Sequence, residues 1–147
     1  MPLHPFLVHF TLSLALLFGI WAIFPKLGER IPAKGRRLAE NSALLFLILA
    51  GLSGGVSLEN LEARHLPIPP LAALHRLLAL SGASLFLLLW VAARSRFPLP
   101  MPVRRVIAFV GLLLVLSAAG VGGHLVYEDR LGTDFTTASP PPESPGP

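Results

Sequence analysis

Cysteine is absent from this chain of 147 residues, and charged residues are scarce at 14%. The lack of cysteine excludes disulfide bonds, thiolate metal sites and a cysteine nucleophile. Ordinary soluble domains carry about 25% charged residues, so the low charge disfavours a water-soluble enzyme and a nucleic-acid-binding protein. The sequence also lacks the G-x-S-x-G, Walker A and H-E-x-x-H patterns, and so has no signature of a hydrolase or a kinase.

Long apolar stretches dominate what is present, with 53% hydrophobic residues and a mean hydropathy of +0.67. A helix needs about 20 mostly apolar residues to cross a hydrocarbon core of roughly 30 Å. Four stretches meet this need, at about residues 5–24, 38–58, 71–93 and 103–127. They predict an all-α integral membrane four-helix bundle with up-down-up-down topology over residues 1–132. The Pro-rich residues 133–147 predict a disordered tail.

Lysine and arginine are unequally distributed between the two sets of connections. The connections between spans one and two and between spans three and four hold nine of them, whereas Arg64 and Arg130 are the two elsewhere outside the spans. Basic residues concentrate on the cytoplasmic side. The bias predicts a multi-pass protein of the cell's inner (cytoplasmic) membrane with both termini non-cytoplasmic. Because no Lys or Arg precedes Lys26, we expect the first span to be a retained helix and not a signal peptide.

All five histidines fall on the predicted non-cytoplasmic side, at His4, His9, His65, His75 and His124. Ionisable residues within spans are costly and are candidates for function. His9 and His75 are the deepest and lie on different spans. Neutral imidazole is the commonest metal ligand, and haem iron takes axial ligands from the helices of bundles. We therefore predict His9 and His75 as axial ligands of one haem, with His4 and His124 as reserve ligands or proton-handling groups.

Small residues occur at the same depth, where they would make room for a macrocycle. They are Gly51, Gly54 and Gly55 in span two, Gly120, Gly122 and Gly123 in span four, and Ala79 and Gly82 on the His75 face of span three. Close packing between membrane helices explains such residues equally well. Arg64 and Arg76 are predicted to bind haem propionates, since guanidinium binds carboxylate bidentately. Snorkelling towards lipid phosphate is the alternative for Arg76.

The two ends of the apolar region carry recognisable strings, His4-Pro5-Phe6-Leu7-Val8-His9-Phe10 and Gly122-Gly123-His124-Leu125-Val126-Tyr127. Together they resemble a family of small predicted four-helix membrane proteins of unknown function. Its members begin HPFLVHFP, end GGxLVY and carry a third-span histidine, here His75. Some are fused to Rieske-type iron–sulfur domains, which implies electron transfer. This chain departs from the pattern at Thr11, where the family has proline, and after Tyr127, where the family continues with histidine and glycine.

The leading functional hypothesis is a small b-type cytochrome-like electron-transfer module with a bis-histidine haem b near the outer leaflet. A quinone, or a redox partner or larger membrane complex on the non-cytoplasmic side, would exchange electrons with it. One alternative is a copper or zinc protein using His4, His9, His75 and His124. Another is a cofactor-free anchoring or assembly subunit. In each case we expect an accessory or electron-transfer subunit in the lipid bilayer and not a stand-alone enzyme. The sequence leaves open whether the chain forms a homo-oligomer.

Overall fold

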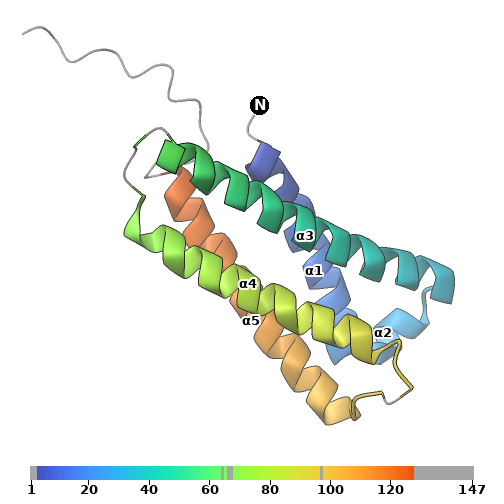
Figure 1. The fold of residues 1–147 in the computed structure, drawn as a ribbon. Helices are drawn as coiled ribbons and strands as arrows, with labels where there is room; N and C mark the ends of the chain where they lie inside the picture. The colour runs from blue at the N-terminus through green and yellow to red at the C-terminus, as the bar shows by residue number, and fades with distance from the viewer. Residues whose placement is uncertain (1–2, 64, 66–67, 97, 128–147) are drawn as a thin grey trace, which may run out of the picture.

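The computed structural model describes residues 3–63, 65, 68–96 and 98–127 (Figure 1), so Arg64, Arg130 and the predicted tail at 133–147 lie outside the described residues. Every regular element in these ranges is a helix. The helices are α1 (Leu3–Ile23), α2 (Pro25–Glu29), α3 (Ala33–Ala63), α4 (Pro70–Ala92) and α5 (Met101–Tyr127). The prediction of an all-α protein is therefore confirmed over the described part of the chain.

Four of these helices, α1, α3, α4 and α5, are long and apolar enough to cross a membrane. They match the four predicted spans and make the chain a multi-pass membrane protein. Helix α3 is longer than its predicted span because its polar ends are helical too. The short helix α2 was not predicted. Pro25 occupies its first turn, where a missing N–H costs little, and the same proline cannot continue α1.

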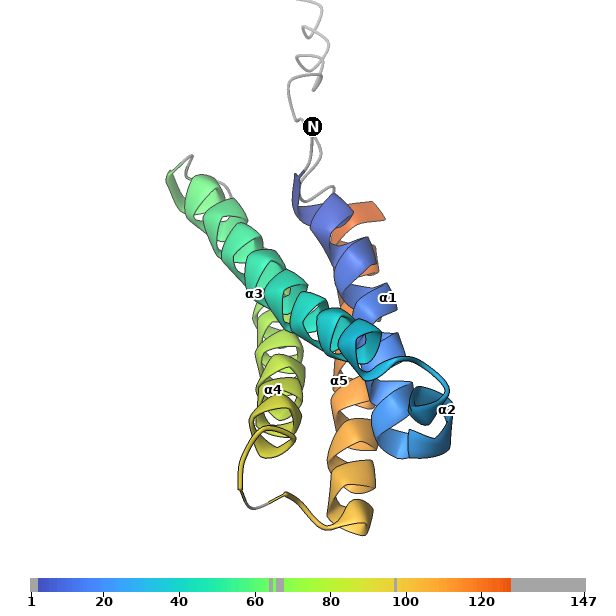
Figure 2. The ribbon, with the colours of Figure 1, turned by 90° about the vertical axis from the view of Figure 1, so that its right-hand side faces the viewer.

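The four long helices form a bundle in which consecutive members run in opposite directions (Figures 1 and 2). Helix α5 packs along α4 and α1, and α1 also packs along α3. Contact between α3 and α4 is much less extensive. Around the bundle the helices therefore follow one another as α3, α1, α5 and α4, so that α1 lies diagonally opposite α4 and α3 lies opposite α5.

The largest fully buried side chains of the core are Phe18 of α1 and Phe86 of α4, each nearer the C-terminal end of its helix. Their ring centroids are 5.4 Å apart. Because lipid tails are as apolar as these side chains, close packing rather than hydrophobic burial holds such helices together. Gly82 belongs to this packing, since a Cβ there would lie 2.8 Å from a methyl group of Val115 on α5. It does not clear space for a macrocycle as the sequence predicts.

Thr11 adds a polar link between α1 and α3. Its side chain is buried, and its hydroxyl lies 2.9 Å from the carbonyl oxygen of Leu7 on its own helix and 2.9 Å from that of Phe46 on α3. Such bonds between membrane helices contribute about 0.6 kcal/mol on average. The Thr11 hydroxyl therefore links α1 to α3.

A polar cluster joins α3 to α4 at the end of the bundle where α3 begins and α4 finishes. The buried Glu40 carboxylate lies 3.7 Å from the Arg94 guanidinium and 3.8 Å from that of Arg36. The Asn41 side-chain oxygen accepts hydrogen bonds from Trp90 and Arg94, at 2.9 and 2.7 Å. We call Glu40, Asn41, Trp90 and Arg94 the α3–α4 clamp, because they hold together two helices that otherwise contact little.

Candidate functional site

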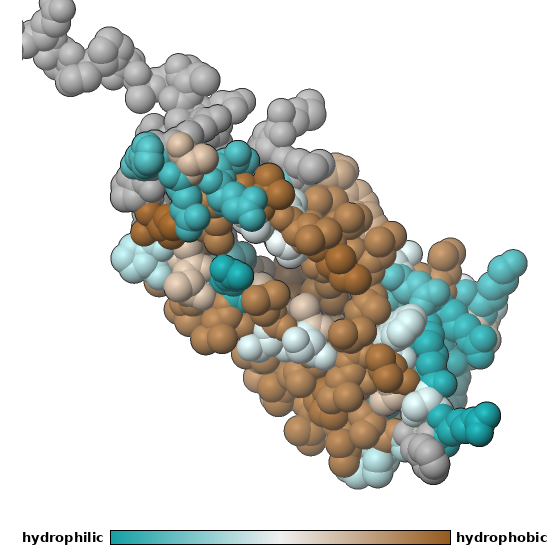
Figure 3. Space-filling model, in the orientation of Figure 1, coloured by the Kyte–Doolittle hydropathy of each residue, from teal (hydrophilic) through white to brown (hydrophobic). Residues whose placement is uncertain are grey.

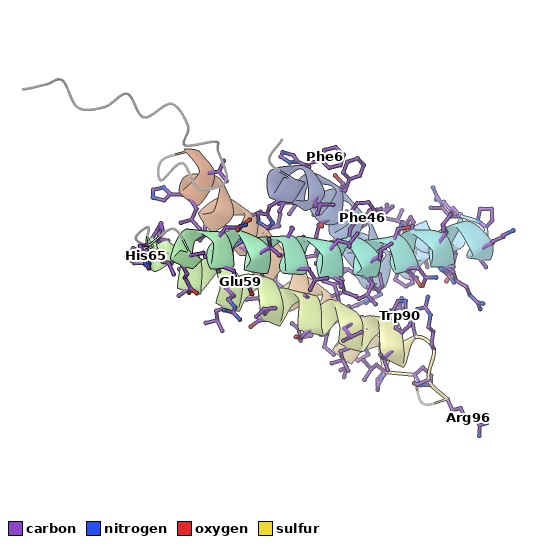
Figure 4. All side chains as sticks on the ribbon, turned by 45° about the horizontal axis from the view of Figure 1, so that its top comes forward. Phe6, Phe46, Glu59, His65, Trp90 and Arg96 are labelled. Carbon is purple, nitrogen blue, oxygen red and sulfur yellow. The ribbon has the colours of Figure 1, made fainter. Side chains whose placement is uncertain are left out.

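A cavity of about 510 Å³ lies between the four long helices, at the end opposite the α3–α4 clamp. Small ligands typically occupy pockets of about 300–1,000 Å³. The space-filling view is hollowed between α3 and α4 (Figure 3), and the side-chain view places Glu59 and His65 at this end and Trp90 and Arg96 at the other (Figure 4). Leu12, Leu47 and Val115 line its inner part. The walls are mostly apolar, and few polar groups reach the cavity.

Two of these polar groups are the imidazoles of His4 on α1 and His75 on α4. Their ring centroids are 6.5 Å apart and their planes meet at 89°. A metal–imidazole bond is about 2 Å long. Two such bonds, with the distance from each bonded nitrogen to its own ring centre, separate two axial imidazole centroids by roughly 6 Å. The observed centroid separation is close to this value, the spacing that one metal ion between the two rings requires.

Hydrogen bonds assign the tautomer of each ring. The Ser53 hydroxyl donates its proton to the carbonyl oxygen of Ala50 at 2.9 Å, so it accepts one from His4 Nδ1 at 2.8 Å. His75 Nδ1 lies 2.8 Å from the carbonyl oxygen of Ala118, which can only accept. Both imidazoles thus carry their proton on Nδ1 when neutral. This leaves a lone pair on each Nε2, the arrangement in which metal-binding histidines are usually held.

The imidazole of His4 favours the neutral state that this arrangement requires. His4 precedes the apolar span Phe6–Ile23. Burial lowers the pKa of His4 below its usual value, and the neighbouring His75 lowers it further. A neutral ring keeps its Nε2 lone pair for a ligand.

Two glycines give the imidazoles room. A Cβ at Gly54 would lie 3.1 Å from Cε1 of His4, and a Cβ at Gly122 would lie 2.8 Å from Cε1 of His75. The first contact is tight and the second is too short for any real side chain. Each ring therefore lies directly against a neighbouring helix, His4 on α3 and His75 on α5.

His9 is not part of this arrangement. It is exposed on α1, does not line the cavity, and lies five positions beyond His4, which turns it by about 140° around the helix. The structure therefore brings His4 rather than His9 next to His75, contrary to the pairing predicted from the sequence. His65 and His124 are also exposed, and neither lines the cavity.

The other predicted site residues divide into two groups. Gly51, Gly55, Ala79 and Arg76 line the cavity. Gly120 and Gly123 do not, and neither does Gly82, which packs against α5. Arg64 lies outside the described residues.

Over the described ranges, no three His, Cys, Asp or Glu side chains cluster to hold a metal ion. The copper or zinc hypothesis needs several imidazoles close to one point, and the structure brings only His4 and His75 together in this way. A haem needs two, because the porphyrin supplies the other four ligands of the iron.

Comparisons with protein-family models, with curated proteins and with solved structures found no match to this chain. The resemblance described above therefore stays a prediction, and the argument for function depends on the site itself.

Sequence reasoning missed Ser53 and Ala118, which hold the imidazoles by hydrogen bonds. It assigned Gly54 and Gly122 to haem clearance, whereas both lie against the imidazoles. A signal for His4 was present. It lies on the same helical face as the buried Thr11, Ala15, Phe18 and Ala22, because their spacings are close to multiples of 3.6. His9 lies off that face, beside the exposed Phe10 and Ser13.

Proposed function

We propose that this protein is a small b-type cytochrome-like module, in which His4 and His75 hold a single haem as axial ligands. The observation that carries the proposal is the pair of imidazoles, with centroids 6.5 Å apart and each Nδ1 hydrogen-bonded to a neighbouring helix. Bound haem supplies reversible one-electron transfer.

The chain's own contribution is to hold and orient the ring system. Ser53 and the Ala118 carbonyl hold the two imidazoles through Nδ1, while Ala79 offers a low wall beside them. Arg76 lies at the cavity on α4 and is exposed, so its guanidinium is suited to bind a propionate near the surface. The mostly apolar walls lower the polarity around the ring system, which helps to set a redox potential.

The proposal includes the predicted membrane orientation. Nine of the twelve Lys and Arg residues fall in or beside the two connections at the end of the α3–α4 clamp. The positive-inside rule makes that end cytoplasmic, and the inner membrane the natural location. The haem would then lie near the non-cytoplasmic surface, within reach of a redox partner there.

Absorption spectroscopy tests this proposal. Protein purified from haem-replete cells should show a Soret band, and an α band in the reduced-minus-oxidised spectrum, with one iron per chain. His75→Ala should lose these bands, and added imidazole should restore them by replacing the missing ring. His124→Ala, a change outside the cavity on α5, should keep them.

Two outcomes would reject the haem assignment. One is wild-type protein that lacks both bands and has no bound iron. The other is a His75→Ala variant that keeps the wild-type spectrum. Copper or zinc bound in proportion to the protein, with no porphyrin, would favour the non-haem alternative instead.

A further inference from the structure

The cavity reaches far from the end of the helices, and this determines how a ligand can enter it. Gly51 and Leu80 both line the cavity and both are exposed. Gly51 is nine residues from Asn60, where the apolar span of α3 ends, and thus about 14 Å below it by helix rise. Leu80 is ten residues, or about 15 Å, from the start of α4. The cavity is therefore open at the side, deep in the apolar part of the bundle.

The side opening lies between α3 and α4, the two neighbouring helices that contact each other least. Space is free beside its glycines, because a Cβ placed on Gly51 or Gly55 would meet no atom of the described residues within 4 Å. The adjacent Leu52 and Leu77 are each 64% exposed. In a bilayer these surfaces face acyl chains, so the opening leads into lipid and not into water.

The water-facing rim is less favourable for an anionic macrocycle. Glu59 and Glu62 line the cavity at that end and are exposed. Their carboxylates would repel the propionates of an approaching haem, while Arg76 offers one cation. A lipophilic ring entering from the side meets apolar walls first.

From these contacts we infer that haem reaches His4 and His75 from the bilayer, sideways between α3 and α4, through the opening beside Gly51 and Gly55. The inference rests on the proposed function for the identity of the ligand. The route itself rests on the exposure, depth and open space at Gly51, Gly55 and Leu80. The α3–α4 clamp holds the far end of the same two helices and so keeps the opening confined to the site.

The absence of cysteine makes the route directly testable with single-cysteine variants carrying a bulky thiol-reactive spin label. Labelled Gly51→Cys in proteoliposomes should take up haem about tenfold more slowly or worse than the unlabelled variant, because the label obstructs the path. Leu45→Cys is the matched control, since Leu45 is exposed on the same helix away from the cavity. Its label should leave the rate unchanged.

The order of addition separates a blocked path from a filled site. Labelling Gly51→Cys after haem is bound should leave the Soret band in place. Displacement of bound haem by the label would overturn the inference, and so would equal uptake rates before and after labelling. If the unlabelled protein binds no haem at all, the proposed function fails and the inference fails with it.

The same label reports whether the opening faces lipid. Its relaxation should respond more to dissolved oxygen, which concentrates in the bilayer, than to a water-soluble nickel chelate. A label on Glu62→Cys at the rim should respond in the opposite way. A Gly51→Cys label that responds more to the nickel chelate would overturn the lateral route, whatever the haem content.

Discussion

His4 Nδ1 donates a hydrogen bond to Ser53 Oγ at 2.8 Å, and this contact between α1 and α3 fixes the ring that faces His75. Ser53 can accept because its own proton goes to the Ala50 carbonyl oxygen. Contacts of this kind between helices can each be removed by one substitution and compared with a control substitution in the same chain.

Removing the Ser53 hydroxyl should remove the hydrogen bond that orients the His4 imidazole. We expect Ser53→Ala to lower haem affinity by about 10–100-fold, as loss of a partner that orients a metal ligand usually does. Ser84→Ala is the control, because that hydroxyl donates to the Leu80 carbonyl oxygen within α4 and Ser84 does not line the cavity. Titration of the apoprotein with haem measures both affinities, and equal values would contradict the role given to Ser53.

A methyl group at position 122 should displace His75. Its Cβ would lie 2.8 Å from the ring, and overpacking of this kind costs about 1–3 kcal/mol. We therefore expect Gly122→Ala to lower the thermal unfolding temperature and to reduce haem binding. Gly120→Ala meets nothing within 4 Å and should be neutral or stabilising by up to about 1 kcal/mol. Similar melting curves for the two variants would contradict the close contact between Gly122 and the His75 ring.

The α3–α4 clamp should contribute to stability without touching the site. In Arg94→Gln the buried Glu40 keeps only the Arg36 guanidinium at 3.8 Å, so we expect a loss of about 1–3 kcal/mol. The haem spectrum should not change. Arg96→Gln, an exposed change two residues further on, should leave both quantities unaltered. Thermal unfolding in detergent, followed by circular dichroism, compares them, and a stable Arg94→Gln protein would contradict the importance of the clamp.

Thr11→Val keeps the shape of the side chain but removes its hydroxyl, and with it the bond to the Phe46 carbonyl oxygen on α3. The expected cost is about 0.6 kcal/mol, with roughly 1.7 kcal/mol as the upper limit for such bonds. Ser13→Ala removes a hydroxyl that bonds only within α1, to the His9 carbonyl oxygen, and should cost less. A larger loss of stability in Ser13→Ala than in Thr11→Val would contradict a stabilising role for the hydrogen bond between α1 and α3.

The sequence predicted the four long helices well because membrane spans are read from length and composition, which are local properties. Helix α2 was not predicted because its five residues are too few to give a periodic pattern. The sequence paired His9 with His75 because His9 was chosen for its depth, whereas the structure places His4 next to His75. The face of the helix decides which side chain a residue meets. Spacing from Phe18 and Ala22 would have favoured His4.

Contacts between helices set the limit of sequence reasoning at the site. Gly51 and Gly55 were predicted beside the ligand and do line the cavity. Gly54 and Gly122 also line the cavity and lie against the imidazoles, whereas Gly82 packs against Val115. Which glycine meets which side chain depends on the rotation of each helix about its axis, and composition carries no information about that rotation.

The most direct test of the whole account compares His4→Ala with His9→Ala in haem-replete cells. Both changes remove one imidazole from the same end of α1, but only His4 lines the cavity with His75. The account predicts that His4→Ala loses the Soret and α bands and regains them with added imidazole, while His9→Ala keeps the wild-type reduced-minus-oxidised spectrum. Loss of the bands in His9→Ala with retention in His4→Ala would contradict it.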